Sequence, residues 1–463
     1  MEHFGCLCMG KELNVLSDKE SVSIINQLKL KKGNNIMKRR ILAMTLAGLT
    51  ATAMVISGCG GSSDTKQEAG KENAAEGKGS GKEMTYWSMW NSTEGQAKVI
   101  QEAADAYEKE TGIHINIEWK GRDIKTLIGP ALDAGENVDF FDTDYMMLTQ
   151  QNGKYLADLT DMAAEADYEK HIMPILLNNV KEWSDGTLKA MPYQPYTTGV
   201  WYDKAMFEKA GIKETPETFD ELLDVCEQLK KSGVNPMTCN SDGVTLLYGY
   251  QLARYVGQDK VLETLDNADW ANVPEAKQAA DDIRTLFDKG YMSEYAPANY
   301  PEGQNEIGFG ESCMILNASW IPNEINQNTG ATVDWGFFPW PSVEGGVDGP
   351  EASMVGSQGF GIVDKSEYKQ EAFDFLLTVV TGDYDSKMAE AVASIPSDVE
   401  NTEWPESVSG AEPYFKEMTK TYQWAVGLEN NPTYKEILQE NLIKLTKLEL
   451  DGQSFVDTMT AAK

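Results

Sequence analysis

The chain has 463 residues and a formal net charge of −33, because 73 acidic residues outnumber 40 lysines and arginines. A surface this negative repels a phosphate backbone, which argues against a nucleic-acid partner. The length leaves room for two domains.

The first feature in chain order is an apolar run preceded by positive charge. Three basic residues at positions 38–40 stand directly before the uncharged run 41–56. This run is shorter than the roughly 20 apolar residues of a membrane-spanning helix, and its layout is that of a secretory signal. It ends in Ile56-Ser57-Gly58-Cys59, which resembles the lipobox of bacterial lipoproteins. The resemblance implies cleavage before Cys59 and lipid on that cysteine; the alternative is an ordinary signal peptide in which Cys59 is incidental.

This interpretation divides the start of the chain into three segments. Residues 37–58 are predicted to be a lipoprotein signal peptide. Because secretory signals begin at the N-terminus, residues 1–36 are predicted to be a non-native upstream extension, with Met37 as the first residue. Residues 59–83 are rich in Gly, Ser, Lys and Glu, a composition that predicts a flexible linker. The folded body would then be held at the extracellular face of the membrane.

From Met84 onward, short apolar runs alternate with amphipathic segments. The predicted strands span 84–90, 113–119, 138–141, 199–202 and 314–316. The first predicted helix follows polar caps at 91–94 and runs to about 111, and the others span 123–134, 205–210, 215–231, 246–255, 261–265 and 274–290. The segment 193–196 is expected to be a loop. The alternation indicates α/β structure with a mostly parallel sheet covered by helices.

Ligands of such sheets gather at the carboxyl ends of the strands. Five side chains are expected at such ends: Trp90, Asn91, Glu94, Asp142 and Asp144. One of the two aspartates is expected to cap the helix that follows, and the other would be free to bind a ligand.

The order of several motifs resembles the carbohydrate-type (family 1) extracellular solute-binding proteins of bacterial ABC importers. The resemblance covers essentially all of residues 84–463. It rests on Trp201-Tyr202-Asp203-Lys204, Thr215-Pro216-Glu217-Thr218-Phe219, Asn317-Ala318-Ser319-Trp320, Gly336-Phe337-Phe338-Pro339-Trp340-Pro341 and Gly359-Phe360-Gly361-Ile362. One departure is Glu311-Ser312, where many relatives have Gly-Lys, so that turn is assigned no role.

The resemblance implies a two-lobe fold of the periplasmic-binding-protein type, with the ligand in the cleft between the lobes. Each lobe would be a mostly parallel sheet flanked by helices. The predicted lobe 1 comprises 84–194 plus 341–400, and lobe 2 comprises 195–340 plus 401–463. The chain would cross between them near 192–199, 339–343 and 395–409, where Pro and Gly are frequent.

A sugar needs aromatic faces for its rings and polar groups for its hydroxyls. Trp320 matches the position where relatives often place a tryptophan against the sugar; the alternative is a lobe-core residue. Gln358 precedes Gly359, where a ligand can approach the backbone closely. The other candidates are Tyr193 and Tyr196, for which hinge packing is the alternative, with Tyr248, Tyr250 and Trp340.

Catalytic signals are weak. His114 and His171 stand alone, and no His-Glu-x-x-His, phosphate-binding Gly-rich loop or Gly-x-Ser-x-Gly is present. We therefore expect no enzymatic activity, no cofactor and no metal. Cys226, Cys239 and Cys313 are an odd number, which argues against a disulfide framework but allows one pair.

The predicted function is that of a lipid-anchored, monomeric receptor. It would capture a sugar or oligosaccharide outside the membrane and deliver it to the transmembrane subunits of an ABC permease. One alternative is the same fold with a non-sugar solute. Another is a secreted glycosidase, which needs two carboxylates about 5–10 Å apart across a cleft.

Overall fold

The computed structural model describes residues 81–462. The predicted upstream extension, the signal peptide and Cys59 lie outside the described residues. Within the described part of the chain, no helix is long and apolar enough to cross a membrane.

The described strands form one mixed sheet in the order β2-β1-β3-β8-β4-β6-β5, with β7 beside β4 and β9 beside β8. Their bounds are β1 Glu83–Ser88, β2 His114–Trp119, β3 Phe140–Asp144, β4 Met191–Asp203, β5 Asn235–Met237, β6 Ser312–Ala318, β7 Trp335–Phe338, β8 Ala352–Ile362 and β9 Lys420–Tyr422. The predicted α/β class is confirmed. Parallel pairing joins β1 to β2 and β3, and β5 to β6. The sheet is nevertheless mixed, because β8 runs antiparallel to β3 and β4, and β4 runs antiparallel to β6 and β7.

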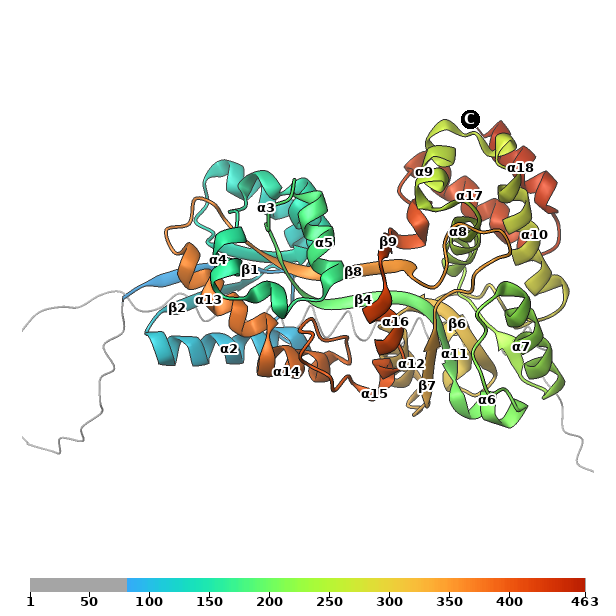
Figure 1. The fold of residues 1–463 in the computed structure, drawn as a ribbon, viewed down its shortest axis with the longest axis horizontal. Helices are drawn as coiled ribbons and strands as arrows, with labels where there is room; N and C mark the ends of the chain where they lie inside the picture. Colours follow the sequence, from blue (N-terminus) through green and yellow to red (C-terminus); the bar gives the residue numbers. More distant parts are fainter. Residues whose placement is uncertain (1–80, 463) are drawn as a thin grey trace, which may run out of the picture. The chain divides into compact units, whose positions relative to one another are not determined.

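Helices cover this sheet in two groups (Figure 1). The principal ones are α2 Gly95–Thr111, α3 Ile124–Ala134, α5 Pro174–Trp183, α13 Lys369–Val380 and α14 Gly382–Val392 in the first group, and α7 Phe219–Lys231, α8 Gly243–Val256, α9 Gln258–Asn267, α10 Pro274–Asp288, α11 Glu302–Gly308, α12 Ile321–Thr329, α17 Pro432–Thr446 and α18 Gly452–Ala461 in the second. The predicted helix ends agree with these bounds to within a few residues. The exception is the helix predicted from 215, which begins at Phe219 because Thr218 and Glu221 form a capping box there.

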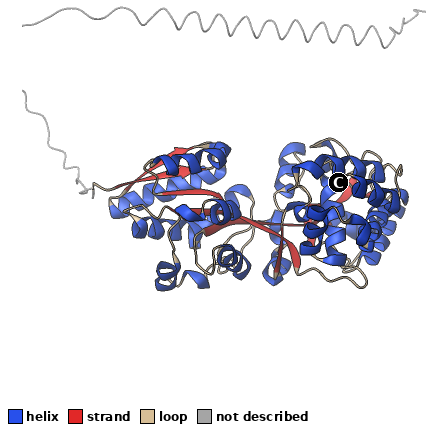
Figure 2. Ribbon diagram, turned by 90° about the horizontal axis from the view of Figure 1, so that it is seen from above, coloured by secondary structure: helices blue, strands red, loops and turns tan. Residues whose placement is uncertain are grey.

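Two clusters of buried side chains form the core, one mainly in each lobe; the first also includes Ile307 of α11 and Ile321 and Ile325 of α12. In lobe 1, Ile100, Ile128 and Phe375 bring the first group of helices against β1–β3. In lobe 2, Leu247 of α8 and Phe455 of α18 belong to the other core, with residues of β5 and β6. The long strands β4 and β8 pair with each other and continue from one lobe to the other (Figure 2).

The structure corrects two local expectations and settles one point that the sequence left open. The segment 193–196 is not a loop but lies within β4. Its Tyr-Gln-Pro-Tyr sequence, preceded by Pro192, is accommodated by a shift of register against β8 at Gln194, whose φ is 49°. The first strand ends at Ser88, before Trp90. The three described cysteines are all unpaired and buried, so the pair that the sequence allowed is not formed.

Candidate functional site

A buried carboxylate joins the ends of the first strands to the crossing strand β4. Asp142 Oδ1 accepts hydrogen bonds from the Tyr86 hydroxyl and from the Met89 backbone N–H, both at 2.9 Å. Asp142 Oδ2 accepts one from the Tyr193 hydroxyl, which in turn accepts one from Trp90 Nε1 at 2.6 Å. Burial raises the pKa of Asp142 to about 6, although all three donors favour its charged form. Since none of these side chains is more than 5% exposed, the network holds the strand ends together.

A second group surrounds Arg122 at the edge of lobe 1. The Arg122 guanidinium lies 4.4 Å from the centroid of the Trp90 ring and 2.8 Å from Glu94 Oε1. Glu94 Oε2 also accepts the backbone N–H of Asn91 at 2.5 Å. Trp90 and Glu94 therefore meet around a cation, and Asn91 is hydrogen-bonded to Glu94. The sequence did not identify Arg122, because nothing in its local pattern distinguishes it from an ordinary surface arginine.

The aromatic group at the lobe 2 end of the crossing strands consists of Tyr196, Trp320 and Trp424. Trp320 is 42% exposed, which is high for a tryptophan. The Trp424 ring is stacked against it, with centroids 5.9 Å apart and planes at 22°. Tyr196 meets Trp320 edge-on at 5.4 Å, and its hydroxyl donates to Asp144 Oδ2 at 3.2 Å. Asp144 Oδ1 accepts the backbone N–H groups of Met146 and Met147, as a cap does.

Trp424 is carried by a strained turn after β9. Ala425, Val426 and Gly427 follow it with φ of 46°, 56° and 79°. A β-branched residue such as Val426 rarely adopts positive φ, and such strain is concentrated at functional sites. The sequence analysis missed Trp424. Its only signal was a tryptophan near a glycine, which many core segments share.

Three predicted residues are buried in the core of lobe 2. Tyr248, Tyr250 and Trp340 are fully buried. The Tyr250 hydroxyl contacts Ser353 Oγ at 3.0 Å, and Trp340 Nε1 donates to Gln251 at 2.8 Å. Their place is interior, and the structure does not bring them to the exposed face of Trp320.

Gln358 lies beside the crossing instead. It faces Asp144 on β3 and Tyr193 on β4 in the sheet register. Its side-chain Oε1 is buried and has no hydrogen-bond partner among the described residues. An unpaired buried acceptor is costly, so this atom is an exception among the buried polar groups of the crossing.

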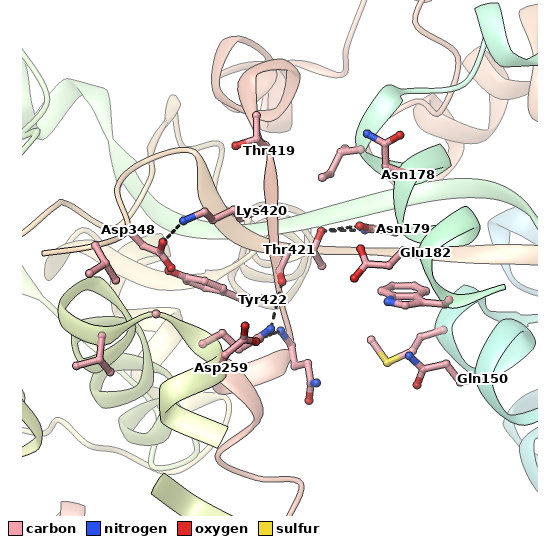
Figure 3. A pocket seen from close by; sticks show the side chains of 18 residues that line it. Gln150, Asn178, Asn179, Glu182, Asp259, Asp348, Thr419, Lys420, Thr421 and Tyr422 are labelled. Carbon is pink, nitrogen blue, oxygen red and sulfur yellow. Dashed lines mark hydrogen bonds and ion pairs between the residues drawn. The ribbon is translucent and has the colours of Figure 1, made fainter. Parts of the chain in front are cut away.

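A cavity of about 540 Å³ opens between α5 of lobe 1 and β9 and α9 of lobe 2 (Figure 3). Asn179 Nδ2 donates to Thr421 Oγ1 at 2.8 Å, which joins the two walls. Lys420 pairs with the buried Asp348. The polar lining is completed by Gln150, Asn178, Glu182, Gln258, Asp259 and Gln423. The predicted site residues do not line this cavity. Two residues of its wall are nevertheless close in sequence to the aromatic group: Met146 is two positions after Asp144, and Gln423 directly precedes Trp424.

Amide and carboxylate groups of this kind can bind hydroxyls, and exposed tryptophan faces can cover apolar ring surfaces. Within residues 81–462, no three His, Cys, Asp or Glu side chains lie close enough together to hold a metal ion.

The sequence profile described as "Bacterial extracellular solute-binding protein" matches residues 90–381. The chain belongs to this family. One relative of this binding protein is the diacetylchitobiose-binding protein DasA of Streptomyces coelicolor, 25% identical over 381 residues, which cover 78% of this chain and 82% of the relative.

Solved structures have the same fold. A probable secreted solute-binding lipoprotein from Streptomyces coelicolor matches with a TM-score of 0.68 at 16% identity, covering 82% of this chain and 98% of the other. A sugar transporter from Bacillus licheniformis in complex with stachyose matches with a TM-score of 0.57 at 21% identity, covering 82% and 98%. The predicted two-lobe fold is thus confirmed.

Proposed function

We propose that this binding protein is a lipid-anchored receptor that captures a neutral sugar or oligosaccharide between its lobes and delivers it to an ABC permease. The observation that carries the proposal is the exposed side chain of Trp320, which is stacked on Trp424 and linked to the carboxylate of Asp144 through Tyr196. The aromatic face suits the C–H face of a pyranose, and the carboxylate accepts hydrogen bonds from its hydroxyls. The names of the relatives, which include a diacetylchitobiose-binding protein and a stachyose complex, support this ligand class.

The predicted residues take different roles in this proposal. Tyr196, Trp320 and Asp144 would contact the solute directly, with Gln358 as a further acceptor. Asp142, Tyr193 and Trp90 would hold the strand ends in place beneath them. The polar cavity next to β9 would supply amides and carboxylates as the lobes move together. A solute drives that closure only through a higher affinity for the closed form.

Charge argues for a neutral ligand. The cavity and the aromatic group carry the acids Asp144, Glu182 and Asp259. The cation of the cavity, Lys420, is already paired with Asp348. An anionic solute would be repelled by these carboxylates, whereas hydroxyl groups would be bound by them.

A thermal-shift screen of the purified full chain tests the proposal. Neutral oligosaccharides, acidic oligosaccharides, amino acids and peptides would be compared. A ligand that binds only the native state stabilises it and so raises the melting midpoint. At a ligand concentration of a hundred times Kd, the free energy of unfolding increases by about 2.7 kcal/mol. We expect neutral carbohydrates alone to do so, and the shift to vanish in Trp320→Ala. A shift with an amino acid or peptide instead would contradict the proposal, and release of shorter sugars during incubation would indicate a glycosidase.

A further inference from the structure

A buried arginine lies in lobe 2, outside the site described above. Arg254, near the end of α8, is fully buried, which is rare for an arginine unless its charge is satisfied. Its guanidinium donates to the carbonyl of Trp340 at 2.7 Å and to that of Ala352 at 2.9 Å. It also donates to the Tyr422 hydroxyl at 3.1 Å. Arg254 therefore joins three segments that are far apart in the sequence: the one after β7, the start of β8, and β9.

The Tyr422 hydroxyl connects this cation to a buried carboxylate. It accepts from Arg254 and donates to Asp348 Oδ2 at 2.8 Å. Asp348 is 6% exposed and also pairs with Lys420, two positions before Tyr422 on the same strand (Figure 3). Hydrogen bonds to charged partners are stronger than neutral ones. The cation and the carboxylate thus hold β9 between them.

The segment that carries Trp424 continues along α8. A Cβ atom at Gly249 would lie 2.6 Å from the carbonyl oxygen of Ala425, so the strained turn after Trp424 packs directly on the helix. Thr245, about one turn earlier in α8, donates to the carboxylate of Glu429. Helix α8 therefore contacts this segment on both sides of the tryptophan, through the hydroxyl of β9 before it and through these two contacts after it.

The position of the Trp424 ring depends on how its backbone is held. The three residues after it have positive φ in succession, and such a conformation persists only where surrounding contacts enforce it. On the β9 side, Arg254 presents its donors in a rigid fork. Removal of the fork would leave buried oxygens without that donor, which is costly, and β9 would shift in response. Trp424 would then move away from Trp320.

We infer that Arg254 is a positioning residue of the solute site: through Tyr422 it holds Trp424 against Trp320, although it is too deeply buried to contact a solute itself. This inference rests on the proposed function and adds a residue of the lobe 2 core to the site. The stacking of the two tryptophans exists without a solute, so the positioning role can be measured separately from binding.

Circular dichroism of the unliganded full chain measures the tryptophan pair. Two stacked indole rings couple their electronic transitions, and the resulting band should be present in the unmutated protein and absent from Trp424→Ala. Arg254→Met, which keeps the length of the side chain but removes its donors, should lose most of the band. Arg254→Lys should retain part of it, because the charge is kept and the fork is lost. Arg284→Met is the matched control and should keep the band, because Arg284 of α10 donates to the carbonyl of Leu450, before α18.

Binding provides the second measurement. The probes are diacetylchitobiose and stachyose, the sugars named for a relative and for a solved structure. For a probe that binds, Arg254→Met should weaken the affinity about tenfold. The same substitution made in Trp424→Ala should cause little further loss, because the effects of a residue that acts through another are not additive with it.

The outcomes separate this inference from the proposed function. An unchanged band in Arg254→Met, or the same loss of affinity with and without Trp424, would overturn the positioning role and leave the sugar receptor intact. If Arg254→Met does not fold, Tyr422→Phe replaces it; this variant removes only the hydroxyl between Arg254 and Asp348. A weaker band is then expected, and an unchanged band would overturn the inference. If neither sugar binds the unmutated protein, the result counts against the proposed function, and the band alone decides the positioning role.

Discussion

At the residue scale, the exposed face of Trp320 distinguishes a binding residue from a core residue. If Trp320 covers a sugar ring, Trp320→Ala should weaken ligand binding by roughly 2–4 kcal/mol, as loss of an interface hot spot does. The unliganded protein should lose little stability, because Trp320 is already 42% exposed. Calorimetric titration and a denaturation curve measure the two effects.

Trp270 provides the control for this prediction. It is completely buried in lobe 2, so Trp270→Ala should cost about 3–5 kcal/mol of folding stability. If Trp320→Ala leaves the affinity unchanged and loses as much stability as Trp270→Ala, Trp320 is a core residue and not part of the site.

Asp142 predicts a pH dependence of folding. Burial raises the pKa of Asp142 to about 6 in the folded protein, whereas an aspartate in the unfolded chain has a pKa near 4. The folded state therefore binds this proton more tightly than the unfolded chain does. The corresponding stabilisation is fully present below pH 4 and is lost as the pH rises through 6, by roughly 3 kcal/mol in total.

The variant Asp142→Asn isolates this contribution from those of the other carboxylates. The difference in unfolding free energy between the protein and the variant should fall from pH 4 to pH 6 and stay level above pH 7. Denaturation curves across this range provide the measurement. Parallel curves for the two proteins would show that Asp142 does not titrate in this way.

The sequence predicts a residue's place in the site only where local pattern is enough, because that place depends on neighbours in space. Asp142 and Asp144 were predicted because they follow a strand. In the structure both carboxylates accept hydrogen bonds from residues of β4, Asp142 from Tyr193 and Asp144 from Tyr196. The sequence could not show that Tyr248 and Tyr250 differ from Tyr193 and Tyr196 in position, because an aromatic residue has the same local sequence pattern in a core and in a cleft. Only tertiary packing shows that they lie inside lobe 2.

At the element scale, close packing of β4 and β8 positions the aromatic group. Gly356 of β8 lies opposite Tyr196 of β4 in the register. A Cβ atom at Gly356 would overlap the Tyr196 ring. Gly356→Ala should therefore displace Tyr196 from Trp320 and Asp144, weaken ligand binding, and cost about 1–3 kcal/mol of stability through overpacking.

The control for this prediction is Gly129→Ala in α3. A Cβ at Gly129 meets no atom within 4 Å, and alanine is the better helix former. This variant should keep its affinity and its stability. Titration and melting of both variants measure the effect, and a Gly356→Ala protein with unchanged affinity would show that the position of Tyr196 is unimportant for binding.

Element types were predictable where the pattern was local. The helix ending at Gly112 and the one ending at Gly211 were recognised from their glycines, both of which have left-handed φ. The strand β4 was misread over 193–196, because Pro195 within the segment and Pro192 just before it are typical of a loop. Its strand partner β8 is about 160 positions away in the sequence, so no local signal could restore the assignment.

At the scale of the whole molecule, two lobes share one sheet through β4 and β8. The Asn179–Thr421 hydrogen bond adds a contact between α5 and β9 across the cavity. Only the order of motifs predicted this architecture from sequence, because the antiparallel pairing of β3 and β4 with β8 cannot be read from an alternation of strands and helices. A solute bound at the crossing, as we propose, would contact segments of both lobes, and its binding would thereby be coupled to their movement.

In the proposed function, the place of this protein in the cell depends on Cys59, which precedes the described residues. We propose that Cys59 becomes the first residue of the mature protein and carries two acyl chains through its side chain. Two chains give stable anchoring, whereas one chain gives only marginal binding to a bilayer. The predicted linker of about 25 residues would then give the folded body a reach of roughly 25–30 Å from the membrane.

Intact-mass analysis of the membrane fraction tests this anchoring. The mass should equal that of residues 59–463 plus the lipid, and Cys59→Ala should move the protein to the medium or leave its signal peptide uncleaved. Cys226→Ala is the control, because Cys226 is buried in lobe 2 and should not affect the anchor. A mature protein that begins elsewhere, or that begins at Cys59 without lipid, would contradict the proposal. That result would leave the proposed solute site untested, since the residues assigned to that site all lie within 81–462.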